Sequence, residues 1–225
     1  MDRPYIECIS LSKEYKGKKR IVHALKDVTF SAGKGEFVLL KGRSGAGKST
    51  LLNLIGGLIK PTHGTVRIED DIITTLDNNT LSGLLLNKTG IIFQSLNLLP
   101  TYSVFENIEV ALAPKGFSAD EIRDLAAPYL EQFGLSDKIN MFPEELSLGQ
   151  QQKVAIIRTL VKKPELILAD EPTASVDDET AGEILKHLRD LKNKQNVTIL
   201  LATHGIVPDT FADRVVTLEN GILVH

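Results

Sequence analysis

The stretch GRSGAGKST, residues 42–50, decides the fold of this chain. An apolar run at residues 36–40 precedes it and a second apolar run at 51–55 follows it, which predicts a buried strand before the loop and a helix after it. Strand, glycine-rich loop, Lys-Ser and helix form the arrangement of a phosphate-binding P-loop. An ordinary glycine turn is the alternative, and the flanking runs on both sides disfavour it.

The residue types in this loop suit the binding of a nucleotide phosphate. Glycines allow backbone conformations in which several N–H groups point at one anion, and the helix that follows presents its positive end to the same anion. Lys48 supplies a charge for the β- and γ-phosphates, and the Ser49 hydroxyl is a ligand for Mg²⁺. The predicted nucleotide-binding residues of the loop are Gly42, Arg43, Ser44, Gly45, Ala46, Gly47, Lys48, Ser49 and Thr50.

The composition narrows the class of protein. A chain of 225 residues that is 42% hydrophobic can bury a sizeable core in one domain with a subdomain. The net charge of −3 provides no general basic field, so no nucleic-acid partner is expected. A single cysteine, Cys8, excludes an intrachain disulfide and points to a reducing compartment. No signal-peptide pattern and no apolar run of spanning length is present, which predicts a cytosolic chain.

Alternating strand-like and helix-like segments continue along the chain. Ser103 with Glu106 and Ser118 with Glu121 are capping boxes that each predict the start of a helix. Strands are expected at 5–15, 22–30, 36–40, 65–68, 90–93, 166–170, 197–202, 214–218 and 222–224, and helices at 51–58, 77–86, 103–112, 118–133, 150–163 and 178–193.

Polar residues end several of the expected core strands. Asp170 and Glu171 follow an apolar run, and in a P-loop protein the first acid of such a strand holds Mg²⁺ while the second can orient or deprotonate a water. Solvated charges at a strand end are the alternative. Gln94 and His204 also directly follow apolar strands and are candidate site residues for the same reason. Tyr15, at the end of a strand upstream of the P-loop, is either packing or a platform for a nucleotide base.

The whole chain resembles the ATP-binding subunit of ABC transporters. Only the P-loop (Walker A) is shared with other P-loop families, whereas the signature upstream of the acidic strand is much more specific. In order, the motifs are Walker A at 42–50, the Q-loop residue Gln94, the signature at 146–150, Walker B at 166–170 with Glu171, the D-loop at 174–177, and the switch residue His204. A nucleotide kinase or GTPase is excluded by the signature.

The resemblance implies a fold and an architecture. The expected fold is α/β, an ABC ATPase with a mixed-sheet RecA-like core, an N-terminal antiparallel β subdomain and a helical subdomain. Residues 1–225 would form one nucleotide-binding domain, with the helical subdomain inserted at about 95–163. Two such subunits, expected as an ATP-dependent homodimer, would pack head to tail with each ATP between Walker A of one copy and the signature of the other.

The resemblance also implies a role for each site residue. Ser147, Gly149 and Gln150 would bind the nucleotide held by the second copy, and Asp177 would relay between the two sites. Tyr15 would stack on adenine, which favours the platform over packing. Mg²⁺ would be held by Ser49, Gln94 and Asp170. The catalytic residues would be Glu171 as general base, His204 at the γ-phosphate, Gln94 as sensor of Mg²⁺ and attacking water, and Lys48.

Several positions place the chain within the family. Residues 90–100, 106–108 and 149–156 are similar to the lipoprotein-releasing and macrolide-export group. Leu148, however, replaces the first of the paired glycines of the signature, Lys153 stands where Arg is common, and Gly205 stands where an acid is common. Residues before Gly90 lack the double Arg usual in the export group. Because Ser147 and Gly149 are retained, an active enzyme is still expected, although Leu148 could slow hydrolysis by crowding.

The function that these resemblances imply is ATP binding and hydrolysis, with ATP and Mg²⁺, to power a separate integral membrane permease. The chain would lie peripherally on the cytoplasmic face of the plasma (inner) membrane. Export or extraction of a lipoprotein or amphiphile is favoured over import. One alternative is the ATPase of a cell-division-type signalling complex that moves no substrate. Another is a soluble ABC protein, which usually carries two cassettes or a long coiled-coil insertion, and neither is found here.

Overall fold

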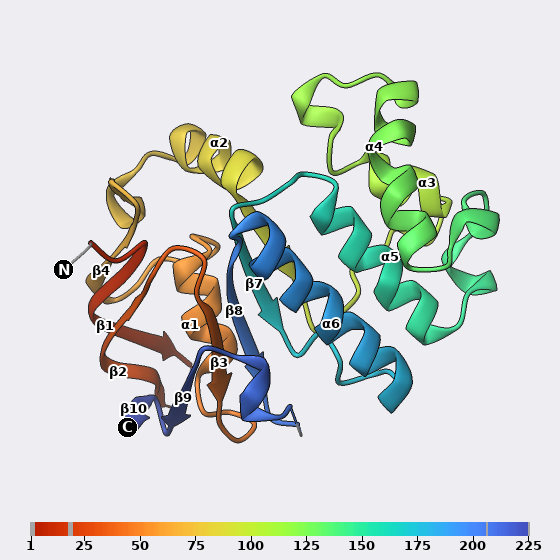
Figure 1. The fold of residues 1–225 in the computed structure, drawn as a ribbon. Helices are drawn as coiled ribbons and strands as arrows, with labels where there is room; N and C mark the ends of the chain where they lie inside the picture. Colours follow the sequence, from red (N-terminus) through yellow and green to blue (C-terminus); the bar gives the residue numbers. More distant parts are fainter. Residues whose placement is uncertain (1–2, 18–19, 206, 225) are drawn as a thin grey trace.

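Strands and helices alternate around two β-sheets in the computed structural model, which describes residues 3–17, 20–205 and 207–224 (Figure 1). The strands are β1 (Ile6–Lys16), β2 (Ile21–Ala32), β3 (Phe37–Lys41), β4 (His63–Ile68), β5 (Asp71–Ile72), β6 (Thr89–Ile92), β7 (Leu166–Asp170), β8 (Thr198–Thr203), β9 (Arg214–Glu219) and β10 (Ile222–Val224). The helices are α1 (Lys48–Ile55), α2 (Asn78–Lys88), α3 (Val104–Glu109), α4 (Ala119–Gln132), α5 (Leu148–Leu160) and α6 (Asp178–Gln195).

The two sheets differ in strand direction. The larger sheet has the order β10-β9-β3-β8-β7-β6, in which β9, β3, β8, β7 and β6 pair in parallel and β10 is antiparallel. The smaller sheet, β2-β1-β4-β5, is antiparallel throughout. The expected mixed-sheet core with an antiparallel N-terminal part is therefore confirmed.

The central parallel strands are buried on both faces, which explains their continuous apolar runs. Along β3, Val38 and Leu40 face a core that includes α1 and the antiparallel sheet, while Phe37 and Leu39 face a core that includes α5 and α6. The strands β7 and β8 alternate in the same way between the two cores. Helix α1 thus lies between the two sheets, directly behind the P-loop (Figure 1).

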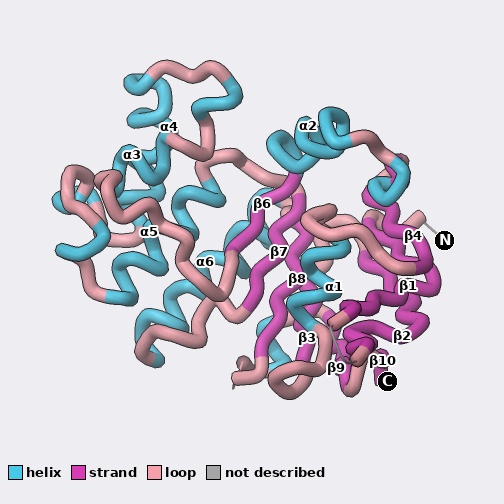
Figure 2. The backbone as a smooth tube through the Cα atoms, turned by 180° about the vertical axis from the view of Figure 1, so that it is seen from behind, coloured by secondary structure: helices cyan, strands magenta, loops and turns pink. Residues whose placement is uncertain are grey.

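Between β6 and β7 the chain forms α3, α4 and α5, which pack on one another beside the larger sheet (Figure 2). Both predicted capping boxes are present, with Ser103 capping α3 through Glu106 and Ser118 capping α4 through Glu121. Buried apolar residues on one side of α4, such as Ile122 and Leu130, belong to the same core as α5 and the parallel strands. The amphipathic pattern of this helix therefore reflects packing against the other helices.

Two helices begin earlier than the sequence pattern predicts. Helix α1 starts at Lys48 rather than 51, directly after Gly47, whose left-handed backbone makes it the first residue outside the helix. Helix α5 starts at Leu148 rather than 150, because the Ser147 side chain accepts from the Gln150 N–H in a capping box that the sequence analysis missed. In both cases the start is fixed by a cap, whereas the apolar pattern begins later.

Among the helices of the described residues, none combines the length and the apolarity that a membrane crossing requires.

Candidate functional site

The P-loop runs between β3 and α1 and is pressed against neighbouring backbone. Gly47 has φ 108°, and a Cβ there would lie 2.5 Å from the carbonyl oxygen of Ala24. A side chain at Gly42 would similarly lie 2.3 Å from the carbonyl oxygen of Leu218. The loop is also tied to the β9–β10 turn, since the Gly221 N–H donates to the Ala46 carbonyl at 3.0 Å. Glycine at position 47 is therefore required both by conformation and by space.

Lys48, the first residue of α1, is almost fully buried beneath this loop. Its Nζ donates to the carbonyl of Gly42 at 2.8 Å and to that of Arg43 at 3.3 Å. The same nitrogen lies 3.5 Å from Oε1 of Glu171, whose side chain is also buried. An ammonium group is thus held between two loop carbonyls and a carboxylate, where it can meet an anionic phosphate oxygen.

Glu171 follows the last residue of β7 and is held from three sides. Its backbone has φ 51° and its N–H donates to the Ala202 carbonyl at 2.9 Å. Its Oε2 accepts from the His204 backbone N–H at 3.1 Å, and its Oε1 lies 2.6 Å from Nδ1 of His204. An ionised carboxylate only accepts hydrogen bonds, so Nδ1 carries the proton in this pair. The strained backbone and these contacts fix the carboxylate beside Lys48.

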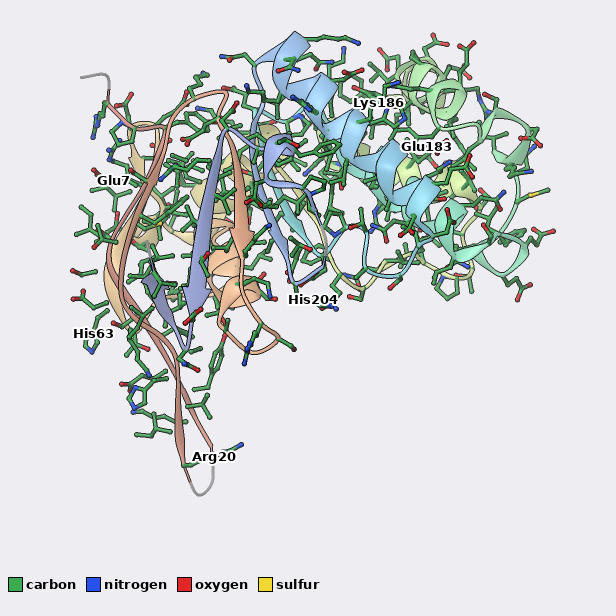
Figure 3. All side chains as sticks on the ribbon, turned by 60° about the horizontal axis from the view of Figure 1, so that its bottom comes forward. Glu7, Arg20, His63, Glu183, Lys186 and His204 are labelled. Atoms are coloured by element: carbon green, nitrogen blue, oxygen red, sulfur yellow. The ribbon has the colours of Figure 1, made fainter. Side chains whose placement is uncertain are left out.

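A cavity of about 300 Å³ lies over the P-loop and collects residues from five parts of the chain. Gln94, Glu171 and His204 enter it from the ends of β6, β7 and β8, and β2 supplies a further wall. The lining residues are Val22, His23, Ala24, Ser44, Gly45, Gly47, Lys48, Ser49, Thr50, Gln94, Glu171 and His204. Figure 3 shows His204 at this end of the molecule and His63 on the far side of the antiparallel sheet, away from the cavity. His63 is exposed and does not line the cavity.

The three predicted metal ligands line one adjoining recess of about 510 Å³: Ser49, Gln94 and Asp170. Oδ1 of Asp170 is buried and has no hydrogen-bond partner among the described residues. Burial raises the pKa of Asp170, although the nearby Ser49 hydroxyl opposes that shift. A hard cation bound by oxygen ligands would satisfy this oxygen and stabilise its charge, so the residues fit Mg²⁺. In the described part of the chain no group of three His, Cys, Asp or Glu could hold a metal, so other ligands would be needed.

Tyr15 stands beside this cavity without lining it. It is half-exposed, with Nζ of Lys13 5.2 Å from the centre of its ring. Its partner across the β1–β2 ladder is Val22, which does line the cavity. Directly paired residues project to the same face of a sheet, so the ring and Val22 share the face of the hairpin that borders the P-loop. The hairpin itself extends beyond the body of the molecule as far as Arg20 (Figure 3).

The signature and D-loop residues form a second cluster. Ser147 caps α5 with Gln150, and Asp177 caps α6 by accepting from the Thr180 N–H at 2.8 Å. A Cβ at Gly149 would lie 3.4 Å from Oγ1 of Thr180, so the starts of the two helices are in contact. None of Ser147, Gly149, Gln150 and Asp177 is among the described residues that line the P-loop cavity. One copy therefore brings together the P-loop, Gln94, Asp170, Glu171 and His204, but not these four.

Sequence reasoning missed the wall that β2 contributes to the cavity, Val22 to Ala24. Nδ1 of His23 lies 3.1 Å from Oε1 of Glu14. Nothing in the local pattern of β2 distinguishes these residues from an ordinary strand, because their place is set by packing of one sheet against the other. The close approach of Gly47 to Ala24 could not be predicted from the sequence either.

The comparisons with known proteins all lead to ATP-binding proteins of ABC transporters. A protein-family model described as ABC transporter matches residues 25–174. The chain is 40% identical over 221 residues to a methionine import ATP-binding protein of Oceanobacillus iheyensis, covering 98% of this chain but only 64% of that protein. It is also 40% identical over 208 residues to the ABC transporter ATP-binding protein YtrE of Bacillus subtilis, covering 92% of this chain and 90% of that one.

A solved structure matches nearly the whole chain. It is the dimeric, post-hydrolysis ATP-binding cassette MJ0796 bound to ADP and Pi, at a TM-score of 0.93 and 38% identity, covering 98% of this chain and 97% of that chain. A protein of that name from Methanocaldococcus jannaschii is an ABC transporter ATP-binding protein of uncharacterized function. The chain thus spans less than two thirds of the methionine import relative and nine tenths or more of the other two.

Proposed function

The chain belongs to the ABC transporter family as an ATP-binding cassette with ATPase chemistry, and from that premise we propose that it hydrolyses ATP to power a separate membrane permease. The observation that supports the proposal best is the cavity over the P-loop, where Lys48, Ser49, Gln94, Glu171 and His204 converge. A cation, a hydroxyl, an amide, a carboxylate and an imidazole around one cavity over the P-loop suit phosphoryl transfer to water.

Nucleotide binding would begin with an exchange of partners at Lys48. Its Nζ is bonded to two loop carbonyls, and an anionic phosphate is a stronger partner than either. Turning toward the β- and γ-phosphates would also draw the ammonium away from Glu171, which lies 3.5 Å from it. The carboxylate would then be free to accept a proton from water. The remaining backbone donors of residues 42–50 would surround the phosphates.

Mg²⁺ bound by Ser49, Gln94 and Asp170 would neutralise the phosphate charge that develops during transfer. Around that position, Asp170 would supply a buried carboxylate oxygen that lacks any other partner among the described residues. Gln94 borders both the P-loop cavity and the metal recess, so its amide is placed between the proposed ion and the attacking water. His204, whose Nδ1 proton is engaged by Glu171, would offer its other ring nitrogen to the γ-phosphate.

A second copy would complete the site. Ser147, Gly149, Gln150 and Asp177 do not line the P-loop cavity of their own chain, and the MJ0796 cassette with ADP and Pi is a dimer. In the proposed homodimer these residues, at the starts of α5 and α6, would meet the nucleotide held by the partner, where helix N-termini favour an anion. Tyr15 would stack on the adenine from the hairpin side. Hydrolysis would remove the bridge between the copies and let the dimer open.

The permease would dock on the helical subdomain, proposed at about 95–163 of the single domain 1–225. This region exposes several large apolar side chains, and a docked partner would cover those that form a continuous patch. They are Leu99, Tyr102, Val110, Phe117 and Phe142. The chain would therefore sit on the cytoplasmic face of the membrane without entering it.

Export or the extraction of a lipoprotein or amphiphile remains the proposed direction, on the strength of residues 90–100 and 149–156. Import is a second candidate, because one relative at 40% identity is named for methionine import. A signalling complex that moves no substrate is the third.

Two measurements test the proposal in turn. Purified chain should release phosphate from ATP only when Mg²⁺ is present, and a chain that binds no ATP would refute it. Affinity purification from detergent-solubilised native membranes should then recover a permease. A partner with few spans and a large extracytoplasmic domain would support export, extraction or signalling, whereas a many-span partner without one would support import. Recovery of no membrane protein would contradict the transport role.

A further inference from the structure

Arg158, near the end of α5, forms hydrogen bonds to the loop that follows Gln94. Its Nη1 donates to the Asn97 carbonyl at 2.6 Å and its Nη2 to the Leu96 carbonyl at 2.9 Å. The two acceptors are the carbonyls of consecutive residues, and the planar guanidinium binds them through two of its nitrogens at once. A lysine, with one nitrogen, cannot reproduce this forked geometry. The contact joins two segments that are more than sixty positions apart in the sequence.

The guanidinium has few alternatives to this contact. Arg158 is partly buried, and this burial lowers the pKa of its guanidinium. Among the ion pairs found in the described residues, none includes Arg158. A partly buried cation without a carboxylate is stabilised by neutral dipoles, and the two loop carbonyls supply them. The fork is therefore held by geometry rather than by charge pairing.

The loop itself is shaped to present those carbonyls. Asn97 has φ 49°, a left-handed conformation that Asn tolerates, and the Ser95 hydroxyl donates to its side chain at 3.0 Å. Farther along, the fully buried Asn107 of α3 accepts from the Leu99 N–H at 2.8 Å and donates to the Leu99 carbonyl at 3.1 Å. The loop is thus fixed at one point to α3 and at another to α5.

Helix α5 connects this loop to the signature. Ser147 caps its start and Arg158 lies eleven positions later, about 16 Å away along a helix that rises about 1.5 Å per residue. A second bond from the same helix end, from Oγ1 of Thr159 to the Ile91 carbonyl at 3.1 Å, reaches the strand that ends beside Gln94. The helix therefore holds the strand just before Gln94 and the loop just after it.

We infer that Arg158 is a positioning residue that fixes the Gln94 loop to the signature helix, so that the two move as one unit. The consequence of this inference rests on the proposed function. If nucleotide bound at Ser147 shifts α5, the shift would also move Gln94, which is one of the proposed ligands of Mg²⁺. The clamp itself is a property of the chain without nucleotide.

Hydrogen exchange of the full chain, followed by mass spectrometry, tests the clamp. The reporters are the backbone N–H groups of residues 95–99 and 101–103. The Leu99 N–H donates to the Asn107 side chain of α3, and the Tyr102 N–H donates to the Leu99 carbonyl within the loop. Without nucleotide, Arg158→Met should exchange these amides at least tenfold faster than the unaltered chain, and Arg158→Lys should be intermediate because it lacks the fork. Equal exchange in all three chains would overturn the inference.

Arg67→Gln is the matched control. Arg67 is buried and, like Arg158, bonds a backbone carbonyl, that of Glu69, but it lies in the antiparallel sheet and pairs with Glu7. It should leave exchange at 95–103 unchanged; if it accelerates the loop as much as Arg158→Met does, the effect is general loosening and the inference is wrong.

Steady-state hydrolysis separates positioning from stability. Arg158→Met should lower kcat about tenfold and raise the Mg²⁺ concentration for half-maximal rate, with KM for ATP within twofold, because the P-loop is untouched. A rise in KM alone would count against the proposed link to Gln94. If Arg158→Met loosens the loop but the unaltered chain binds no ATP at all, the clamp is supported and the proposed function is wrong.

Discussion

Oε1 of Glu171 lies 2.6 Å from Nδ1 of His204, and Oε2 of the same carboxylate accepts from the His204 backbone N–H at 3.1 Å. The two residues follow neighbouring parallel strands, β7 and β8, so the register of the sheet brings them together. Glu171 is buried while the histidine side chain is half exposed. In the proposed cycle this pair keeps the general base oriented while the exposed imidazole remains able to meet a phosphate.

Replacing Glu171 with Gln should stop hydrolysis while leaving nucleotide binding intact. The amide keeps the shape but cannot take a proton, so the rate should fall at least about a hundredfold, the lower range for loss of a general base. With MgATP bound and not consumed, the chain should accumulate as a dimer, which light scattering after size exclusion would detect. Glu165→Gln, which alters an exposed carboxylate before β7, is the control and should hydrolyse normally. Only monomer at saturating MgATP would contradict the dimeric site.

Gly47→Ala should damage both the loop and the fold. Its φ of 108° is one that alanine rarely adopts, and the new Cβ would lie 2.5 Å from the Ala24 carbonyl oxygen. We expect a loss of about 1–3 kcal/mol in the free energy of unfolding, measured by denaturant titration, together with loss of ATP binding.

Gly83→Ala is the matched control, because Gly83 lies within α2 and a Cβ there meets no atom within 4 Å. Alanine should stabilise that helix by about 0.5–1 kcal/mol. Equal stability of the two variants would show that the P-loop can relax around a side chain.

The sequence predicted most of the fold because the strands of the larger sheet are apolar on both faces and the helices carry caps. Residues 166–170 and 222–224 match β7 and β10 at both ends. The local pattern could not show how α1 and the antiparallel sheet meet, since this depends on contacts such as Gly47 with Ala24. For the same reason it missed the wall formed by Val22 and its neighbours.

Residues of the candidate site were easier to find than their mutual contacts. Gln94, Glu171 and His204 each interrupt an apolar strand end, and parallel strands bring such ends to one edge of the sheet. The contact of Lys48 with Glu171 and the grip of Arg158 on residues 96 and 97 needed coordinates, because both join residues far apart in sequence.

Glu69 should make a pH-dependent contribution to stability. A hydrogen bond from Lys88 at 2.5 Å, and a second partner in Lys34 at 3.1 Å, lower the pKa of Glu69. A carboxyl whose pKa is lower in the folded than in the unfolded chain stabilises the fold above the unfolded value, about 4.3, and loses this as pH falls through the folded value.

Glu69→Gln should therefore cost up to about 1 kcal/mol at pH 7, as for a partly exposed ion pair, and this cost should shrink as pH falls below about 4.3 and vanish once pH is below the folded pKa. Urea unfolding of both chains at a series of pH values measures the difference. Added salt should shrink the difference at pH 7. A cost that stays constant down to pH 3 would mean that packing, not charge, is responsible.

Leu148→Gly should leave hydrolysis equal or faster. The leucine is 50% exposed at the first position of α5, next to the Ser147 cap, so its removal breaks little packing within the chain. Glycine inside a helix end costs up to about 1 kcal/mol of stability. At the proposed dimer interface, however, the smaller residue would relieve crowding around the partner's nucleotide. Leu148→Ala separates the two effects, since it removes most of the side chain without the flexibility of glycine. If both variants clearly lose ATPase activity at equal ATP occupancy, the leucine makes a favourable contact across the dimer and the crowding argument is wrong.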